Sequence, residues 1–190
     1  MITATAKLRS LSAYSQSDFF KSSRAEGESH DAFEERCWRE KMHVLDGSVV
    51  IPPMQLKRCL DNGASLRGEK VPGKGSRGWA SFFISGVLVT DPMVLDIDPS
   101  TVRGEWIMAH ADGKKTGTGG RVRRCFPLIP EWKGTATFHI LNAEITDKVF
   151  LRMLDTAGKL VGIGRFRPQN GGMFGRFAVE DLKWAKEKVA

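Results

Sequence analysis

Apolar and polar side chains alternate at the start of the chain. Residues 2–11 place isoleucine, alanine and leucine on one side of an extended backbone, with threonine, lysine and arginine on the other. This period of two predicts a half-buried β-strand. Lys7 and Arg9 lie on the polar side, so the exposed face of the strand is expected to be basic.

Two segments have the longer period of a helix. A β-branched run ends at two prolines, and residues 54–64 follow with apolar side chains at helical spacing. Because proline is favoured in the first turn, a helix is expected to begin there. A second helix is expected over residues 146–160, where Thr146 can cap the first turn and Ile145 and Phe150 can form a hydrophobic staple.

Extended segments fill most of the remaining sequence. Strands are expected at about 82–97, 104–111, 121–129, 135–141 and 174–180. The second and third of these flank a glycine-rich turn, which predicts a long hairpin. The order of strand, helix, strands, helix and strand predicts an α+β fold with a ferredoxin-like, RRM-type βαββαβ core. We expect a single domain, residues 1–190, with insertions at about 22–47 and 104–129.

The first insertion is a charged helical segment. Acidic residues dominate it from Glu26 to Glu35, and residues from Ser29 onward are expected to form a helix packed only lightly on the core. In a basic protein, such a segment could pair with the basic face of a second copy and propagate a filament. The alternative is an exposed helix that its charges keep soluble.

Composition narrows the class of partner. The 190 residues include 29 Lys plus Arg against 22 Asp plus Glu, a net charge of +7 that favours polyanions or anionic membrane surfaces as partners.

The cysteines indicate the compartment. Cys37, Cys59 and Cys125 form no CxxC pair, which predicts reduced thiols in a cytoplasmic protein. The sequence contains neither a signal-peptide pattern nor an apolar run of membrane-spanning length, so we expect no membrane association.

The segment 162–176 combines glycines with arginines. Glycines let a backbone approach a phosphate and expose its N–H groups, whereas arginines bind phosphate oxygens in pairs. A dinucleotide-binding loop is disfavoured because this segment follows a helix and leads into a strand. The alternative is a flexible surface turn. The candidate RNA-binding residues of the segment are Gly162, Gly164, Gly171, Gly172, Arg165, Arg167 and Arg176.

Two stretches resemble the RAMP superfamily of CRISPR-associated proteins. GIGRFRPQNGGMFGRF, between a helix and the last strand, is similar to the family's C-terminal glycine-rich signature, and VVIPPMQLKRCLDNGAS is similar to its strand-to-helix motif. The resemblance implies the repeating backbone subunit of an effector complex, stacked head to tail along a guide RNA. It also implies that the hairpin acts as a thumb over the RNA. Expected partners are guide RNA, a complementary DNA or RNA target and other effector subunits.

Further basic residues complete the predicted RNA-binding surface. They lie on the first strand, the first helix, the loop after it and the hairpin: Lys7, Arg9, Lys57, Arg58, Lys74, Arg77, Lys114, Lys115, Arg121, Arg123 and Arg124. A solvated hairpin tip is the alternative for the last five. Because the polar face of the first strand carries no aromatic side chains, we expect contact with the RNA backbone, independent of sequence.

Catalysis is the competing interpretation. None of His30, His43, His110 and His139 has a nearby nucleophile or carboxylate at a spacing that requires chemistry. The aspartates in VTDPMVLDIDPS resemble a metal-binding run, but strand ends also collect aspartate and proline because these residues form turns. We therefore expect a non-catalytic subunit without metal or cofactor. The alternatives are an endoribonuclease that processes a precursor RNA and a general single-strand-binding protein of viral or mobile-element origin.

Overall fold

The computed structural model describes residues 1–110 and 120–186. Its central sheet contains β1 (Ile2–Ser10), β5 (Val87–Leu88), β9 (Lys133–Ile140) and β10 (Phe177–Lys186), in the order β10-β1-β9-β5. All neighbouring strands are antiparallel. The alternation predicted for β1 is present, because Ala4, Ala6 and Leu8 are buried while the residues between them are more exposed.

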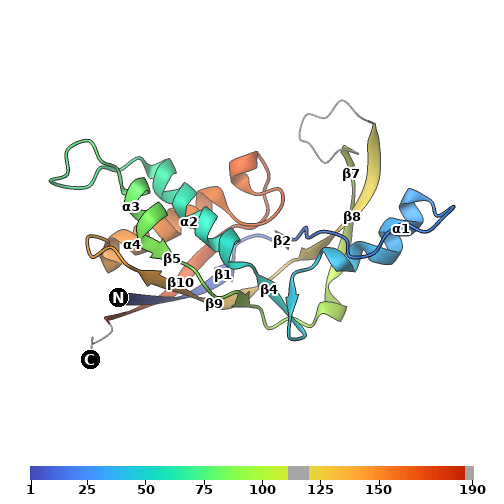
Figure 1. Ribbon diagram of the computed structural model, residues 1–190, viewed down its shortest axis with the longest axis horizontal. Coiled ribbons are helices and arrows are strands. Elements are labelled where there is room, and N and C mark those ends of the chain that lie inside the picture. The colour runs from blue at the N-terminus through green and yellow to red at the C-terminus, as the bar shows by residue number, and fades with distance from the viewer. Residues whose placement is uncertain (111–119, 187–190) are drawn as a thin grey trace.

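Helices cover one face of this sheet (Figure 1). They are α2 (Pro53–Arg67), α3 (Trp79–Gly86) and α4 (Asp147–Thr156), and α4 continues into a π-helical turn, Ala157–Val161. Phe150 of α4 lies at the centre of the core, with its ring 5.1 Å from that of Phe138 and 5.6 Å from that of Trp184. The Thr146 side chain accepts a hydrogen bond from the Val149 amide at 3.3 Å, as a helix cap does.

The helix α3 corrects one expectation. Residues 82–86 were expected in a strand, but they belong to a helix that buries Trp79, Phe83 and Gly86. A short continuous apolar run does not distinguish a buried strand from a buried helix. Of the described residues, 32% are helical and 33% are in strands, so the α+β class is confirmed.

Two smaller sheets lie beside the central one. One has the order β2-β8-β7 and contains β2 (Tyr14–Ser15) and the predicted hairpin, β7 (Arg103–His110) and β8 (Arg121–Ile129). The other has the order β3-β4-β6 and consists of β3 (Val44–Leu45), β4 (Ser48–Ile51) and β6 (Met93–Val94). The hairpin extends away from α2, α3 and α4 (Figure 1). The short 3₁₀ helices are Trp38–Lys41, Pro99–Thr101 and Pro168–Asn170.

The acidic insertion packs more tightly than expected. Its helix α1 (His30–Cys37), capped by Ser29, is followed by the 3₁₀ turn and lies against the hairpin (Figure 1). Phe33, Cys37 and Trp38 are buried. Gly104 of β7 leaves room for the Trp38 ring, since a Cβ there would lie 3.2 Å from it. The expectation of light packing was wrong because the apolar residues of the segment face the hairpin.

Candidate nucleic-acid interface

The hairpin and the glycine-rich segment line a common groove, although they are far apart in the sequence. The groove has a volume of about 640 Å³. Its lining includes Arg121, Arg124 and Phe126 of β8. Arg165 and Phe166 of the glycine-rich segment also line it. Three predicted RNA-binding arginines therefore come together here.

The glycines shape this loop rather than expose its amides. The N–H groups of Gly162, Gly171 and Gly172 donate to the carbonyls of Ala157, Pro168 and Arg167 at 2.9, 2.8 and 3.1 Å. These three amides are therefore not available to a phosphate, which corrects the mechanism expected for them. Gly164 has φ +72°, and a Cβ there would overlap the Ser15 carbonyl, so this position requires glycine.

Arg165 is a partly buried cation of the groove. Its guanidinium carbon lies 3.1 Å from the centroid of Phe126 and 4.8 Å from that of Phe166. Burial, with a contribution from neighbouring Arg124, lowers the pKa of Arg165 to about 10, so it remains protonated at neutral pH. Among the described residues, its buried Nη1 has no hydrogen-bond partner.

A second buried cation lies below the groove. Burial lowers the pKa of Lys41, and the charges of Arg124 and Arg165 lower it further. The Lys41 ammonium donates to Glu34 at 2.6 Å and lies 4.1 Å from the centroid of Phe126. Several like charges thus converge in a partly desolvated place, where an anion would relieve their repulsion.

Arg58 and Arg167 line a separate cavity of about 100 Å³ between α2 and the glycine-rich segment. In the described part of the chain, the buried Nε of Arg167 lacks a hydrogen-bond partner. Arg123 stacks on Trp106 at 4.3 Å and does not line the groove. These arginines lie outside the main groove.

Two predicted contacts have structural roles instead. The Lys57 ammonium is bound by the Asp61 carboxylate at 2.5 Å and by the carbonyls of Phe83 and Ile84. With its side chain 11% exposed, it cannot reach an RNA, so this prediction was wrong. Arg176, directly before β10, donates to the carbonyl of Lys159 in the π-helical turn, so it links these two segments.

The remaining basic residues do not form one surface with the groove. Arg9 pairs with Glu180 at 3.0 Å, and Lys7 lies opposite Asp181 in the sheet register, so the open sheet face has mixed charge. Lys74 pairs with Glu144 at 2.8 Å. It lies, with Arg77, in the loop before α3, at the opposite end of the molecule from the hairpin (Figure 1). Lys114 and Lys115 fall outside the described residues.

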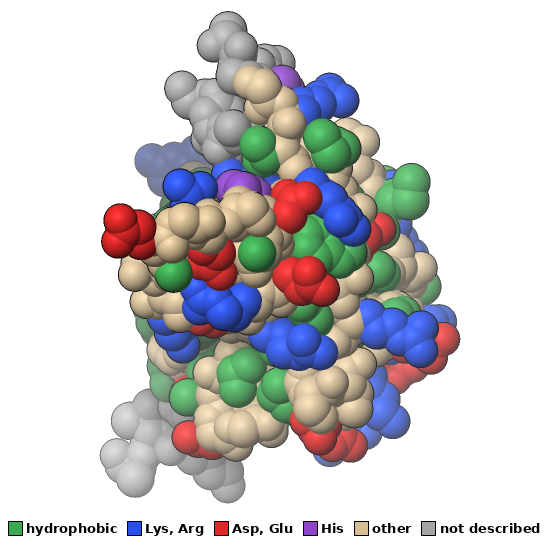
Figure 2. All heavy atoms as spheres, turned by 90° about the vertical axis from the view of Figure 1, so that its right-hand side faces the viewer, with side chains coloured by type: hydrophobic (Ala, Val, Ile, Leu, Met, Phe, Trp, Pro, Cys, Tyr) green, Lys and Arg blue, Asp and Glu red, His purple; other side chains and the backbone are tan. Residues whose placement is uncertain are grey.

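Figure 2 shows the end of the molecule that carries the hairpin and α1. Lys and Arg side chains are interspersed there with Asp and Glu. A uniform positive surface is absent from the described side chains of this face. The groove is therefore distinguished by the partly buried Arg165 rather than by a uniform positive surface.

Tertiary structure also creates a pair that the sequence did not indicate. His43 Nδ1 lies 3.3 Å from Asp18 Oδ2, and its Nε2 lies 3.4 Å from the amide nitrogen of Gln55. Gln55 in turn accepts a hydrogen bond from the Tyr14 hydroxyl at 2.8 Å. His43 was expected to lack a paired carboxylate, so that expectation was wrong. Within the described ranges, no three His, Cys, Asp or Glu side chains are grouped as a metal site requires.

No protein-family model and no curated protein matches the sequence, but solved structures match the fold. Cmr6 from Pyrococcus furiosus is 13% identical, with a TM-score of 0.52 over 94% of this chain and 99% of that chain. A chain of the type III-B Cmr-beta complex bound to cognate target RNA is 11% identical, with a TM-score of 0.48. That match covers 97% of this chain but only 61% of the other. At this level of identity, the match to Cmr6 shows a shared fold. Residues 1–110 and 120–186 include no helix with the length and apolar character of a membrane span.

Proposed function

We propose that this chain is an RNA-binding subunit of a RAMP-type, RNA-guided complex and that it holds the RNA backbone independently of sequence. One observation carries the proposal: Arg121, Arg124 and Arg165 line a single groove. The fold shared with Cmr6 supports it.

The proposed core is a ferredoxin-like βαββαβ unit made of β1, α2, β5, β9, α4 and β10. The strand order β10-β1-β9-β5 supports this assignment, because it places the first and third core strands at the centre. Residues 22–47 and 104–129 are then insertions into one domain. The hairpin strands and α1 lie on the same side of the core (Figure 1). β8 contributes side chains to the groove, and α1 packs on β8.

Phosphate binding follows from the state of the arginines. A guanidinium forms paired, charge-assisted hydrogen bonds with phosphate oxygens, and these bonds strengthen where water is excluded. The Arg165 guanidinium lies against the Phe126 ring, which holds it in place. Because Arg165 is already partly desolvated, little further desolvation is needed when it binds an anion. A phosphate would also neutralise the repulsion with Arg124.

In this proposal, copies of the chain occupy adjacent sites along a guide RNA in a helical array. Base pairing of the guide with a complementary DNA or RNA target supplies the specificity. Other effector subunits complete the complex, which acts in the cytoplasm. The chain itself needs no catalytic residue, metal or cofactor in this role.

A salt titration of RNA binding tests the groove. Replacing Arg121, Arg124 and Arg165 by alanine should weaken binding equally for all sequences. In a plot of the logarithm of the binding constant against the logarithm of the salt concentration, each lost phosphate contact should reduce the steepness of the slope by about 0.7. Arg103→Ala is the control, because Arg103 is exposed at the base of the same hairpin and does not line the groove. An unchanged slope in the triple variant would remove the groove from the interface.

The endoribonuclease alternative has one observation in its favour, the contact of His43 with Asp18. Burial lowers the pKa of His43, and a neutral imidazole can act as a general base. We expect the purified protein to bind repeat RNA without cleaving it. If wild type cleaves the RNA and His43→Ala binds it without cleaving it, the endoribonuclease interpretation replaces the present proposal.

A general single-strand-binding protein is the other alternative. Sequencing of co-purifying nucleic acid distinguishes the two roles. A guide-bound subunit should carry RNA of uniform length, whereas a general single-strand-binding protein should carry heterogeneous strands.

A further inference from the structure

Phe166 has an unusual backbone conformation for its residue type. Its φ is +48°, and the only other described non-glycine residue with positive φ is Asp46. Aspartate adopts the left-handed region readily, whereas a bulky aromatic residue does so at an energetic cost. Phe166 is nevertheless 44% exposed, so burial of this residue does not account for the conformation.

The surrounding loop enforces this conformation. The Phe166 carbonyl accepts from the Phe174 amide at 3.0 Å, and the Arg165 amide donates to the Ser15 carbonyl at 3.0 Å. Gly172 packs directly on the Phe166 carbonyl, since a Cβ there would overlap it. The Phe174 ring meets the Phe166 ring edge-on at 6.3 Å. The loop thus holds Phe166 in a strained backbone conformation in which its side chain is exposed to solvent.

The ring is presented at the groove of arginines. Phe166, Phe126 and the 59% exposed Met108 contribute apolar surface there, next to the Arg165 guanidinium. An aromatic face does not contribute to the binding of a free phosphate, and an apolar peptide does not bind to a group of arginines. A nucleotide within a single strand uses both, because its base stacks on a ring while its phosphate binds arginine.

We infer that Phe166 is a stacking platform for one unstacked nucleobase of the bound RNA strand. This inference rests on the proposed function and adds a base contact to a backbone contact. Every base has a π-face, so the contact is independent of sequence but requires that a base be present. The sequence alone indicated contact with the RNA backbone and did not single out Phe166 for contact with a base.

An experiment that combines one protein variant with one change in the RNA tests the contact. Short oligouridylates with one abasic site, placed at each position in turn, are titrated against wild type and Phe166→Asn. Asparagine tolerates the left-handed region, so this variant removes the ring without disturbing the loop. Stacking on an aromatic side chain predicts that the abasic site costs wild type about fivefold to a hundredfold in affinity at one position. Phe166→Asn should lose the same factor on intact RNA and nothing further at the abasic position.

Two controls separate this contact from phosphate binding. Met173→Ala removes a 70% exposed apolar side chain of the same loop that does not line the groove, and it should bind like wild type. The salt slope of Phe166→Asn should equal that of wild type, since no phosphate contact is lost. An abasic penalty that is the same in both proteins overturns the stacking contact and leaves RNA binding intact. Absence of any RNA binding by wild type removes the proposed function and the inference together.

Discussion

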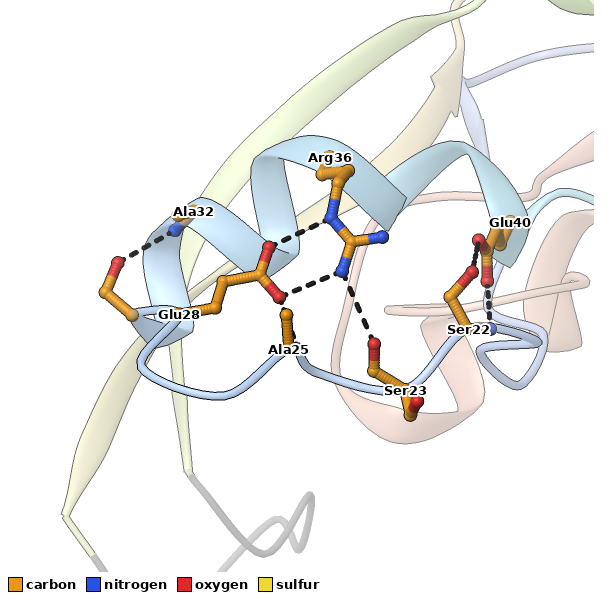
Figure 3. Close-up of polar contacts among 8 residues, drawn as sticks. Ser22, Ser23, Ala25, Glu28, Ala32, Arg36 and Glu40 are labelled. Carbon is orange, nitrogen blue, oxygen red and sulfur yellow. Dashed lines mark hydrogen bonds and ion pairs between the residues drawn. The ribbon is translucent and has the colours of Figure 1, made fainter.

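The acidic segment 22–41 and the glycine-rich segment 162–176 use their charges in opposite ways. In the acidic segment, Glu28 accepts two hydrogen bonds from Arg36 at 2.9 Å, and Glu40 accepts from the Ser22 amide and hydroxyl (Figure 3). In the glycine-rich segment, Arg165 and Arg167 each keep a buried nitrogen without a partner among the described residues. Charges that are already paired are poor candidates for binding a ligand, so the density of charge in a sequence does not by itself locate an interface.

The acidic segment stabilises the hairpin with one buried ion pair. Glu34 accepts from the Cys125 amide at 3.1 Å, and Lys41 donates to the Cys125 carbonyl at 2.8 Å. β2 pairs with β8 only at Leu128 and Ile129, so the ion pair satisfies the edge of β8 beyond that point. The segment expected to bind a second copy therefore supports the wall of the groove.

Breaking the ion pair between Glu34 and Lys41 should have the largest effect on the free energy of unfolding. Glu34→Ala leaves the Lys41 charge buried without its partner, which costs about 3–5 kcal/mol of unfolding free energy. Urea denaturation measures this loss. Glu35→Ala, at an exposed position of the same helix, is the control and should leave the urea midpoint unchanged. A loss of less than about 1 kcal/mol, the range of surface ion pairs, would show that the pair is not buried in solution.

Glycine substitutions in the second segment should have a smaller effect that depends on position. A Cβ at Gly172 overlaps the Phe166 carbonyl, so Gly172→Ala should cost about 1–3 kcal/mol through overpacking and weaken RNA binding. Gly171 has φ +80° with open space around it, so Gly171→Ala should cost about 1–2 kcal/mol through backbone strain alone. Thermal unfolding together with RNA titration distinguishes the two. Gly172→Ala should lose more RNA affinity than Gly171→Ala, because only its Cβ overlaps the Phe166 carbonyl. An equal loss of affinity in both variants would contradict this expectation.

Charge reversal in the acidic segment should affect assembly without affecting stability. Because Glu28 and Glu34 are engaged within the chain, only exposed acids can pair with a second copy, and Glu26, Asp31 and Glu35 are exposed. Changing these three to lysine should remove cooperative binding to long RNA and spare affinity for an RNA of one footprint. Native mass measurement on RNAs of graded length counts the bound copies. One copy of wild type on RNA of every length would exclude the array.

The smallest expected effect concerns His43. Burial lowers its pKa in the folded protein more than Asp18 raises it. The fold therefore favours the neutral imidazole, and the stability it contributes is present above the unfolded pKa of about 6.5 and is lost as pH falls below it. His43→Gln should flatten this part of the pH profile of the unfolding free energy. A steeper profile in the variant would reverse the sign assigned to His43.

The sequence by itself determined the elements whose pattern is local. Alternation fixed the buried face of β1, Thr146 fixed the start of α4, and the glycine-rich turn between two extended segments fixed the hairpin. Each depends on residues within a few positions of one another, where backbone geometry dictates which side chains share a face. The apolar run of α3 was misread because it has no such periodicity. The α+β order and the RAMP resemblance followed from the local elements and from two motifs.

Only the tertiary structure decided which charges remain available. Lys57 and Arg165 are both basic residues in predicted RNA-binding segments, yet one is bound by Asp61 and two carbonyls while the other faces the groove. The strain at Phe166 and the contact of Asp18 with His43 were equally absent from the pattern. The hydrogen-bond partners and the desolvation of a charged group depend on contacts between segments that are far apart in the sequence. These contacts determine whether the group is paired within the fold or remains available to a ligand.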